Sequence, residues 1–178
     1  MNLPNKLTMV RMFLVPVIVA LLLLCETGSA GYYAAGVLFL LASFTDFLDG
    51  YLARKHNWIT NFGKFMDPLA DKLLVCSVLI CLITKGLAPA WAVIAIVARE
   101  FAISGFRLIA VEKGVVLAAS NLAKRKTNVQ TLWVIYLLFP FPWKHWNLTA
   151  AILMAAAVIL TVWSFVDYLL KNRSVLKD

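Results

Sequence analysis

Charged residues are scarce in this chain of 178 residues, because Asp, Glu, Lys and Arg together make up only 15% of it. Soluble globular proteins carry about 25% charged and about 45–50% apolar residues. Here 62% of the residues are hydrophobic and the mean hydropathy is +0.85. The composition excludes an ordinary soluble domain and predicts an integral membrane protein.

Cysteine and histidine are also rare. The three cysteines, Cys25, Cys76 and Cys81, form no CxxC pair, and we expect them to fill apolar space. The two histidines, His56 and His145, are isolated and are expected on opposite sides of the membrane. Neither residue type therefore predicts a metal site.

Acidic residues are outnumbered, with nine Asp and Glu against 17 Lys and Arg, which gives a net charge of +8. A basic protein can bind nucleic acid, but these basic residues stand between apolar runs and not along one polar face. We therefore expect no nucleic acid partner. Anionic lipid headgroups are the better match for this charge.

Six apolar runs approach the length that a helix needs to cross about 30 Å of hydrocarbon. Short polar or Gly/Pro breaks, among them Glu26–Ser29, Lys85–Pro89 and Pro140–Pro142, separate them. The first run has no cleavage pattern after it and is expected to be retained. The prediction is an all-α bundle of six transmembrane helices forming one membrane domain over residues 1–178, with spans at about 8–25, 32–53, 65–84, 90–111, 127–142 and 148–170.

Basic residues are distributed unevenly between the two sides of these spans. One side receives only Lys85 and Lys144, and Trp91, Trp143 and Trp146 mark its interface. The opposite side receives Lys6, Arg11, Arg54, Lys55, Lys64, Lys113, Lys124, Arg125, Lys126, Lys171, Arg173 and Lys177. By the positive-inside rule, both termini are predicted to lie in the cytoplasm, with the protein in the cell membrane.

Two pairs of aspartates interrupt the apolar runs at this cytoplasmic edge. Asp46 and Asp49 end the second span, and Asp67 and Asp71 begin the third. Spacings of three and four residues put each pair on one helix face. The hairpin between the spans would bring both pairs to the same depth, so four carboxylates are expected to meet.

Like charges about 4 Å apart repel by about 4 kcal/mol at an effective dielectric of 20, so four carboxylates need compensation. Protonation or ion pairs with Arg54, Lys64 and Lys72 could supply it. Bound Mg²⁺ or Mn²⁺ is the alternative that suits an all-oxygen ligand set. Gly50, Ala53 and Gly63 would leave bare helix faces nearby, for helix packing or for a ligand.

The motif Asp46-Phe47-Leu48-Asp49-Gly50-Tyr51-Leu52-Ala53-Arg54, followed by eight residues, Gly63, three residues, Asp67, three residues and Asp71, resembles the signature of the CDP-alcohol phosphatidyltransferases at every fixed position. The resemblance implies a six-helix membrane enzyme, often a homodimer, with its site open to the cytoplasm. It also implies that Asp46, Asp49, Asp67 and Asp71 hold two divalent cations and that Asp71 is the general base. The residues implied to lie along the CDP-lipid are Gly50, Ala53, Arg54, Thr60 and Gly63, with Asn5 and Thr8 as further candidates, for which helix capping is the alternative.

A second polar cluster, on the fourth and fifth spans, predicts the acceptor. Arg99 and Arg107 are eight residues apart and share a helix face. With Lys124 and Lys126 they would form a cationic pocket for a phosphate. The alternatives are pairing of Arg99 with Glu100, and membrane anchoring for the lysines.

The chain further resembles bacterial members of the family that transfer a phosphatidyl group from CDP-diacylglycerol to sn-glycerol 3-phosphate, giving phosphatidylglycerophosphate and CMP. The segments that carry this resemblance are 2–5, 98–101 and 124–127. Inositol phosphate, serine or phosphatidylglycerol as acceptor are the alternatives within the family. A cation-coupled transporter that uses the aspartates as an ion path is the alternative of another class.

Overall fold

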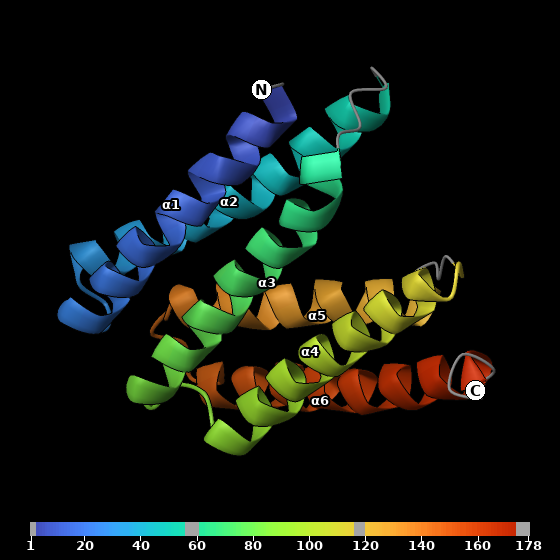
Figure 1. The fold of residues 1–178 in the computed structure, drawn as a ribbon. Helices are drawn as coiled ribbons and strands as arrows, with labels where there is room; N and C mark the ends of the chain where they lie inside the picture. The colour runs from blue at the N-terminus through green and yellow to red at the C-terminus, as the bar shows by residue number, and fades with distance from the viewer. Residues whose placement is uncertain (1–2, 56–60, 116–119, 174–178) are drawn as a thin grey trace. The chain divides into compact units, whose positions relative to one another are not determined.

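The computed structural model describes residues 3–55, 61–115 and 120–173, with side chains described except at 3–5, 46–55 and 61–65. Over these ranges the chain is helical and contains no strand. The helices are α1 (Leu3–Leu24), α2 (Ala30–Lys55), α3 (Asn61–Thr84), α4 (Ala90–Glu112), α5 (Asn121–Leu138) and α6 (Trp146–Lys171) (Figure 1). The all-α prediction is confirmed.

The boundary predicted for the fifth helix was wrong at both ends. α5 begins at Asn121 and ends at Leu138, whereas the apolar run predicted 127–142. Its first turns are polar, and Ser120 caps them, since its Oγ accepts the backbone N–H of Ala123 at 3.1 Å. The lysines at 124 and 126 therefore lie within the helix and not in a loop before it.

Two glycines end helices as the turn chemistry requires. Gly86 and Gly114 adopt left-handed φ values of 70° and 73° after α3 and α4. At each, two backbone N–H groups bond back to carbonyls of the last turn, including Leu87 N to Leu82 O at 3.0 Å and Val115 N to Ala110 O at 2.8 Å. A side chain at either position would strain this conformation.

Contacts group the chain into two compact units, the first comprising Met1–Leu87 with Val134–Pro140 and the second Ala88–Trp133 with Phe141–Asp178. In the first unit, α1 packs against both α2 and α3 (Figure 1). Val15, Ile18 and Leu22 form the buried stripe of α1, while Phe13 and Leu24 stay exposed. Cys76 and Cys81 of α3 are buried, as expected for residues that fill apolar space.

The start of α2 is joined to the last residues of α5 within the first unit. Tyr32 is fully buried and its hydroxyl donates to the carbonyl of Leu137 at 2.9 Å. The hydroxyl of Tyr33 donates to the carbonyl of Pro140 at 3.3 Å, and its ring stacks on Phe139. The ring of Phe139 also covers Gly36, where an added Cβ atom would lie 2.8 Å from the ring.

Lys85, one of the two basic residues predicted on the outer side, caps a helix. Its Nζ donates to the carbonyl of Cys25 at 2.8 Å, just beyond the last residue of α1. A cation at a helix C-terminus satisfies free carbonyls and favours the helix dipole. This contact gives a structural role to Lys85, which the sequence places on the side with few basic residues.

In the second unit, α4 packs against α6. Ile103, Phe106 and Ala110 of α4 form a buried cluster with Tyr168 of α6. The rings of Phe106 and Tyr168 meet edge to face at 5.6 Å between centroids. This apolar cluster holds the two helices in register beside the polar groups described below.

Among the described residues, two helical segments are long and apolar enough to cross a membrane, Lys6–Leu24 and Trp146–Lys171. The apolar segment Ala30–Thr45 of α2 is shorter. Large apolar side chains point outward on every helix, for example Phe44, Leu108 and Trp163. The other spans and the single membrane domain stay predictions.

Substituting Gly36 with alanine tests the contact between α2 and Phe139. The new methyl group would displace the ring and should lower the free energy of unfolding by about 1–3 kcal/mol, the usual effect of overpacking. Gly105→Ala is the matched control, because nothing lies within 4 Å of a Cβ atom there. Thermal unfolding of the purified variants in detergent measures the effect, and equal melting temperatures would contradict it.

Candidate functional site

The four aspartates of the motif lie on two helices of the first unit. Asp46 and Asp49 fall in the last turns of α2, and Asp67 and Asp71 in the first half of α3. The side chains of Asp67 and Asp71 are partly buried. Those of Asp46 and Asp49 lie outside the described residues, so the convergence of the two pairs stays a prediction.

Most of the residues predicted along the CDP-lipid also have side chains outside the described part of the chain. Gly50, Ala53 and Arg54 lie in α2 and Gly63 in α3, in stretches of which only the backbone is described. Thr60 lies outside the described residues, as does the side chain of Asn5. Thr8 is the candidate whose surroundings the structure gives.

Thr8 contacts a carboxylate of the motif. It is fully buried in α1, and its hydroxyl donates to Oδ1 of Asp67 in α3 at 2.5 Å. Hydrogen bonds from a hydroxyl to a carboxylate typically measure 2.5–2.7 Å and are stronger than neutral ones. The bond thus orients the Asp67 carboxylate against the first helix, a contact that sequence spacing did not predict.

Asp67 and Asp71 fit a site for a hard divalent cation, since they offer carboxylate oxygens one helical turn apart and partly open to solvent. A complete ligand set would need Asp46 and Asp49. Within the described part of the chain, no group of three or more His, Cys, Asp and Glu residues is placed to hold a metal ion.

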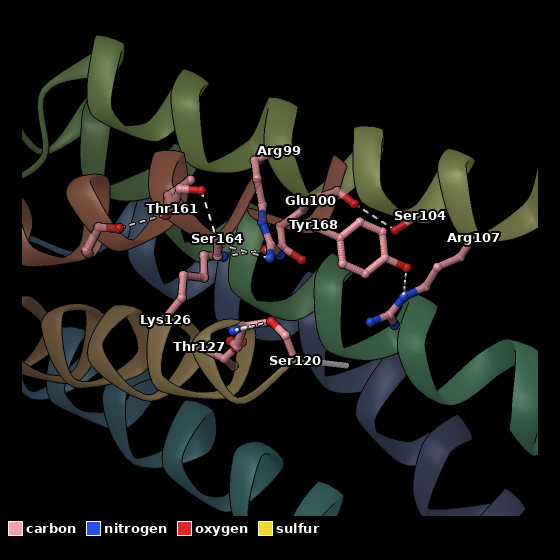
Figure 2. A network of polar contacts seen from close by, with 12 residues as sticks. Arg99, Glu100, Ser104, Arg107, Ser120, Lys126, Thr127, Thr161, Ser164 and Tyr168 are labelled. Atoms are coloured by element: carbon pink, nitrogen blue, oxygen red, sulfur yellow. Dashed lines mark hydrogen bonds and ion pairs between the residues drawn. The ribbon is translucent and has the colours of Figure 1, made fainter. Parts of the chain in front are cut away.

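The predicted acceptor residues lie in the second unit, where Figure 2 shows a network between α4, α5 and α6. Oε1 of Glu100 accepts from Nη1 of Arg99 at 3.0 Å and also pairs with Nζ of Lys126. Nη2 of Arg99 donates to Oγ of Ser164 at 3.1 Å. One carboxylate thus joins two cations from different helices.

Both of these cations are removed from solvent, with Lys126 1% and Arg99 8% exposed. The pairing of Arg99 with Glu100, weighed as an alternative from the sequence, is confirmed. The pair between Lys126 and Glu100 was not predicted, because it joins residues that are distant in sequence and depends on α5 beginning at Asn121. Lys124, two residues earlier, is exposed.

Arg107, the fourth predicted acceptor residue, lies against Tyr168 of α6 (Figure 2). Its Nε donates to the tyrosine hydroxyl at 3.3 Å, and its guanidinium lies 5.8 Å from the ring centroid. The side chain is partly exposed. The buried ring and hydroxyl of Tyr168 thus orient the guanidinium of Arg107.

On α4 and α5, two buried polar atoms have no hydrogen-bond partner among the described residues, Nε of Arg99 and Oε1 of Gln130. Gln130 is 4% exposed and lies one turn after Lys126 on α5. Buried polar atoms normally have partners, which include water and ligands. Sequence reasoning missed Gln130, although a glutamine in an apolar run one turn beyond Lys126 was a signal.

Replacing Glu100 with glutamine tests the ion network. The change leaves two buried cations without their carboxylate and should lower the free energy of unfolding by about 2–3 kcal/mol, since breaking a buried pair costs about 3–5 kcal/mol and Glu100 is only partly buried.

Asp167→Asn is the matched control, because Asp167 pairs at 2.8 Å with Lys171, whose side chain is 66% exposed. Such surface pairs contribute about 0–1 kcal/mol. Their spacing of four residues is typical of an ion pair on a helix surface. Melting temperatures measure both variants, and an equal effect would contradict the importance of the buried network.

Comparison with known proteins identifies the chain at the level of its family. The profile of the CDP-alcohol phosphatidyltransferases matches residues 1–163. A Bacillus subtilis protein, CDP-diacylglycerol–glycerol-3-phosphate 3-phosphatidyltransferase, is 44% identical over 189 residues, covering 99% of this chain and 97% of the relative.

Two further relatives agree. The enzyme of the same name from Rickettsia typhi is 46% identical over 129 residues, covering 72% of this chain and 71% of the relative. A probable phosphatidylglycerophosphate synthase from Mycobacterium tuberculosis H37Rv is 39% identical over 170 residues, covering 94% and 79%. The match spans both carboxylate pairs and the cationic cluster, which comprises Arg99, Arg107, Lys124 and Lys126. The chain belongs to the CDP-alcohol phosphatidyltransferase family.

Proposed function

We propose that this protein transfers the phosphatidyl group of CDP-diacylglycerol to sn-glycerol 3-phosphate, producing phosphatidylglycerophosphate and CMP for phosphatidylglycerol and cardiolipin synthesis. The observation that carries the proposal is the 44% identity, over nearly the whole of both chains, to a Bacillus subtilis enzyme whose name states this donor and this acceptor. Such a reaction needs acidic residues to hold divalent cations and basic residues to bind a phosphate, and the acidic motif and the cationic cluster offer these residue types.

The proposed enzyme crosses the cell membrane six times as a single domain, with both termini and the active site on the cytoplasmic side. Six helices with outward apolar side chains support this arrangement, as does the concentration of Lys and Arg on one side. We further propose a homodimer, on the family resemblance alone.

Asp46, Asp49, Asp67 and Asp71 would hold two divalent cations, Mg²⁺ or Mn²⁺. When bound, such ions neutralise the pyrophosphate of the CDP-lipid and favour departure of the leaving phosphate. Gly50, Ala53 and Gly63 would leave room for the nucleotide, and Arg54 would offer a cation to its phosphates. Asn5 and Thr60 remain proposed nucleotide contacts, whereas the hydroxyl of Thr8 donates to Asp67.

The reaction is a displacement at the lipid-side phosphorus. The free primary hydroxyl of the acceptor attacks this phosphorus, the bond to the bridging oxygen breaks, and the electron pair leaves with CMP. Asp71 is positioned in the first half of α3, partly open to solvent, and we assign it the hydroxyl proton. The reacting oxygen thereby gains nucleophilic character as the new bond forms.

A phosphorylated acceptor suits the cationic cluster. Arg107 keeps a partly exposed guanidinium, whose planar fork matches a phosphate, and Lys124 adds a compact exposed charge. Lys126 and Arg99 contribute from the buried side, where Glu100 offsets part of their charge. Serine carries no phosphate and would leave these cations without a ligand.

Acceptor selectivity tests the proposal. Purified enzyme with CDP-diacylglycerol and Mg²⁺ should release CMP with sn-glycerol 3-phosphate and not with serine, inositol phosphate or phosphatidylglycerol. EDTA should stop the release, and added Mg²⁺ or Mn²⁺ should restore it. Exclusive use of another acceptor would overturn the assignment, and ion transport without CMP release would indicate a transporter.

Within the same assay, Arg107→Met should raise the KM for sn-glycerol 3-phosphate about 10-fold or more, because it removes charge-assisted bonds worth about 1.5–3 kcal/mol. The KM for CDP-diacylglycerol should not change. Arg125→Met is the matched control, since Arg125 is an exposed basic residue of α5 outside the proposed pocket.

Asp71→Asn tests the base. Loss of a general base should reduce kcat by about 100-fold or more, while the protein still binds CDP-diacylglycerol. Binding is measured by the shift in melting temperature that the lipid nucleotide produces. Normal turnover of the purified variant would refute the role of Asp71.

A further inference from the structure

The buried stripe of α1 changes character along its length. Its buried positions are Thr8, Arg11, Val15, Ile18 and Leu22, which recur every three or four residues on one helix face. The last three are apolar, as expected for a face packed against α2 and α3. The first two are polar, although they too are fully removed from solvent.

Each of these polar residues contacts a helix that bears a carboxylate pair. Nε of Arg11 donates to the carbonyl of Ala42 in α2 at 3.3 Å, one turn before Asp46. Thr8 donates to Asp67 of α3. The sequence analysis counted Arg11 only among the basic residues of the predicted cytoplasmic side, and its complete burial was not predicted.

Stability alone does not explain polar residues here. Apolar side chains of similar volume usually serve a buried site as well as, or better than, a buried polar network. The threonine hydroxyl is also uncharged and donates to one oxygen of Asp67. It therefore does not offset the negative charge that the other oxygen can present to a cation. Partners of this kind orient metal-ligating carboxylates in many metal sites.

We propose that Thr8 is a positioning residue of the metal site: its hydroxyl fixes the rotamer of Asp67, so that the second carboxylate oxygen is directed at the cation. The inference rests on the proposed function, which makes Asp67 a metal ligand. It assigns α1, a helix outside the aspartate motif, a part in metal binding.

The experiment measures Mn²⁺ binding to the purified full-length enzyme in detergent, from the loss of the free-ion EPR signal and without substrate. Thr8→Val keeps the volume of the side chain and removes the donor, and it should weaken Mn²⁺ binding about 10-fold or more, as loss of such a partner typically does. Thr8→Ser keeps the donor and should bind close to wild type.

Thr161→Val is the matched control. Thr161 is also buried in a helix, but its hydroxyl donates to the carbonyl of Ala157 in its own helix at 2.7 Å. This variant should bind Mn²⁺ like the wild type. A second readout is the KM for CDP-diacylglycerol at saturating Mg²⁺, which Thr8→Val should leave unchanged.

The outcomes separate the possible failures. Unchanged Mn²⁺ binding by Thr8→Val would overturn the inference. If this variant instead raised the KM for CDP-diacylglycerol, Thr8 would be a nucleotide contact. Weak binding by Thr8→Ser as well would assign the effect to packing of the methyl group and would also overturn it. A wild-type enzyme that binds no Mn²⁺ would overturn the proposed metal site itself.

Discussion

Buried polar groups must find their partners inside this protein, because hydrocarbon offers none. Apolar packing cannot by itself choose between neighbouring helices and lipid, which are equally apolar. Several of the contacts between helices are accordingly polar: Thr8 with Asp67, Tyr32 with the carbonyl of Leu137, and Lys126 with Glu100. In each unit these contacts act together with apolar packing to select which turns of the helices face one another.

Local features of the sequence predicted the helices well. Apolar runs and Gly/Pro breaks act over a few residues, so the ends of α3 and α4 follow from the conformations of Gly86 and Gly114. The start of α5 was missed because its first turns are polar. A cap signal was present, since Ser120 stands three residues before the Ala123 amide that it binds, but the contact that stabilises those turns comes from Glu100 on another helix.

The candidate site was predictable where chemistry depends on spacing, and not where it depends on packing. Spacings of three and four residues place each aspartate pair on a helix face, and the motif gives the family. The burial of Arg11 could not be predicted, because a basic residue near a span end fits a headgroup contact equally well. Tyr168 became a partner of Arg107 only through the packing of α4 on α6.

The arrangement around Glu100 stabilises two buried cations. Arg99 and Lys126 buried without an anion would repel each other and carry the full cost of desolvation. Glu100 pairs with both cations, while Arg107 is held by the hydroxyl of Tyr168. Arg99 and Lys126 are therefore stabilised by a contact within the fold itself, while the partly exposed guanidinium of Arg107 can meet an anion.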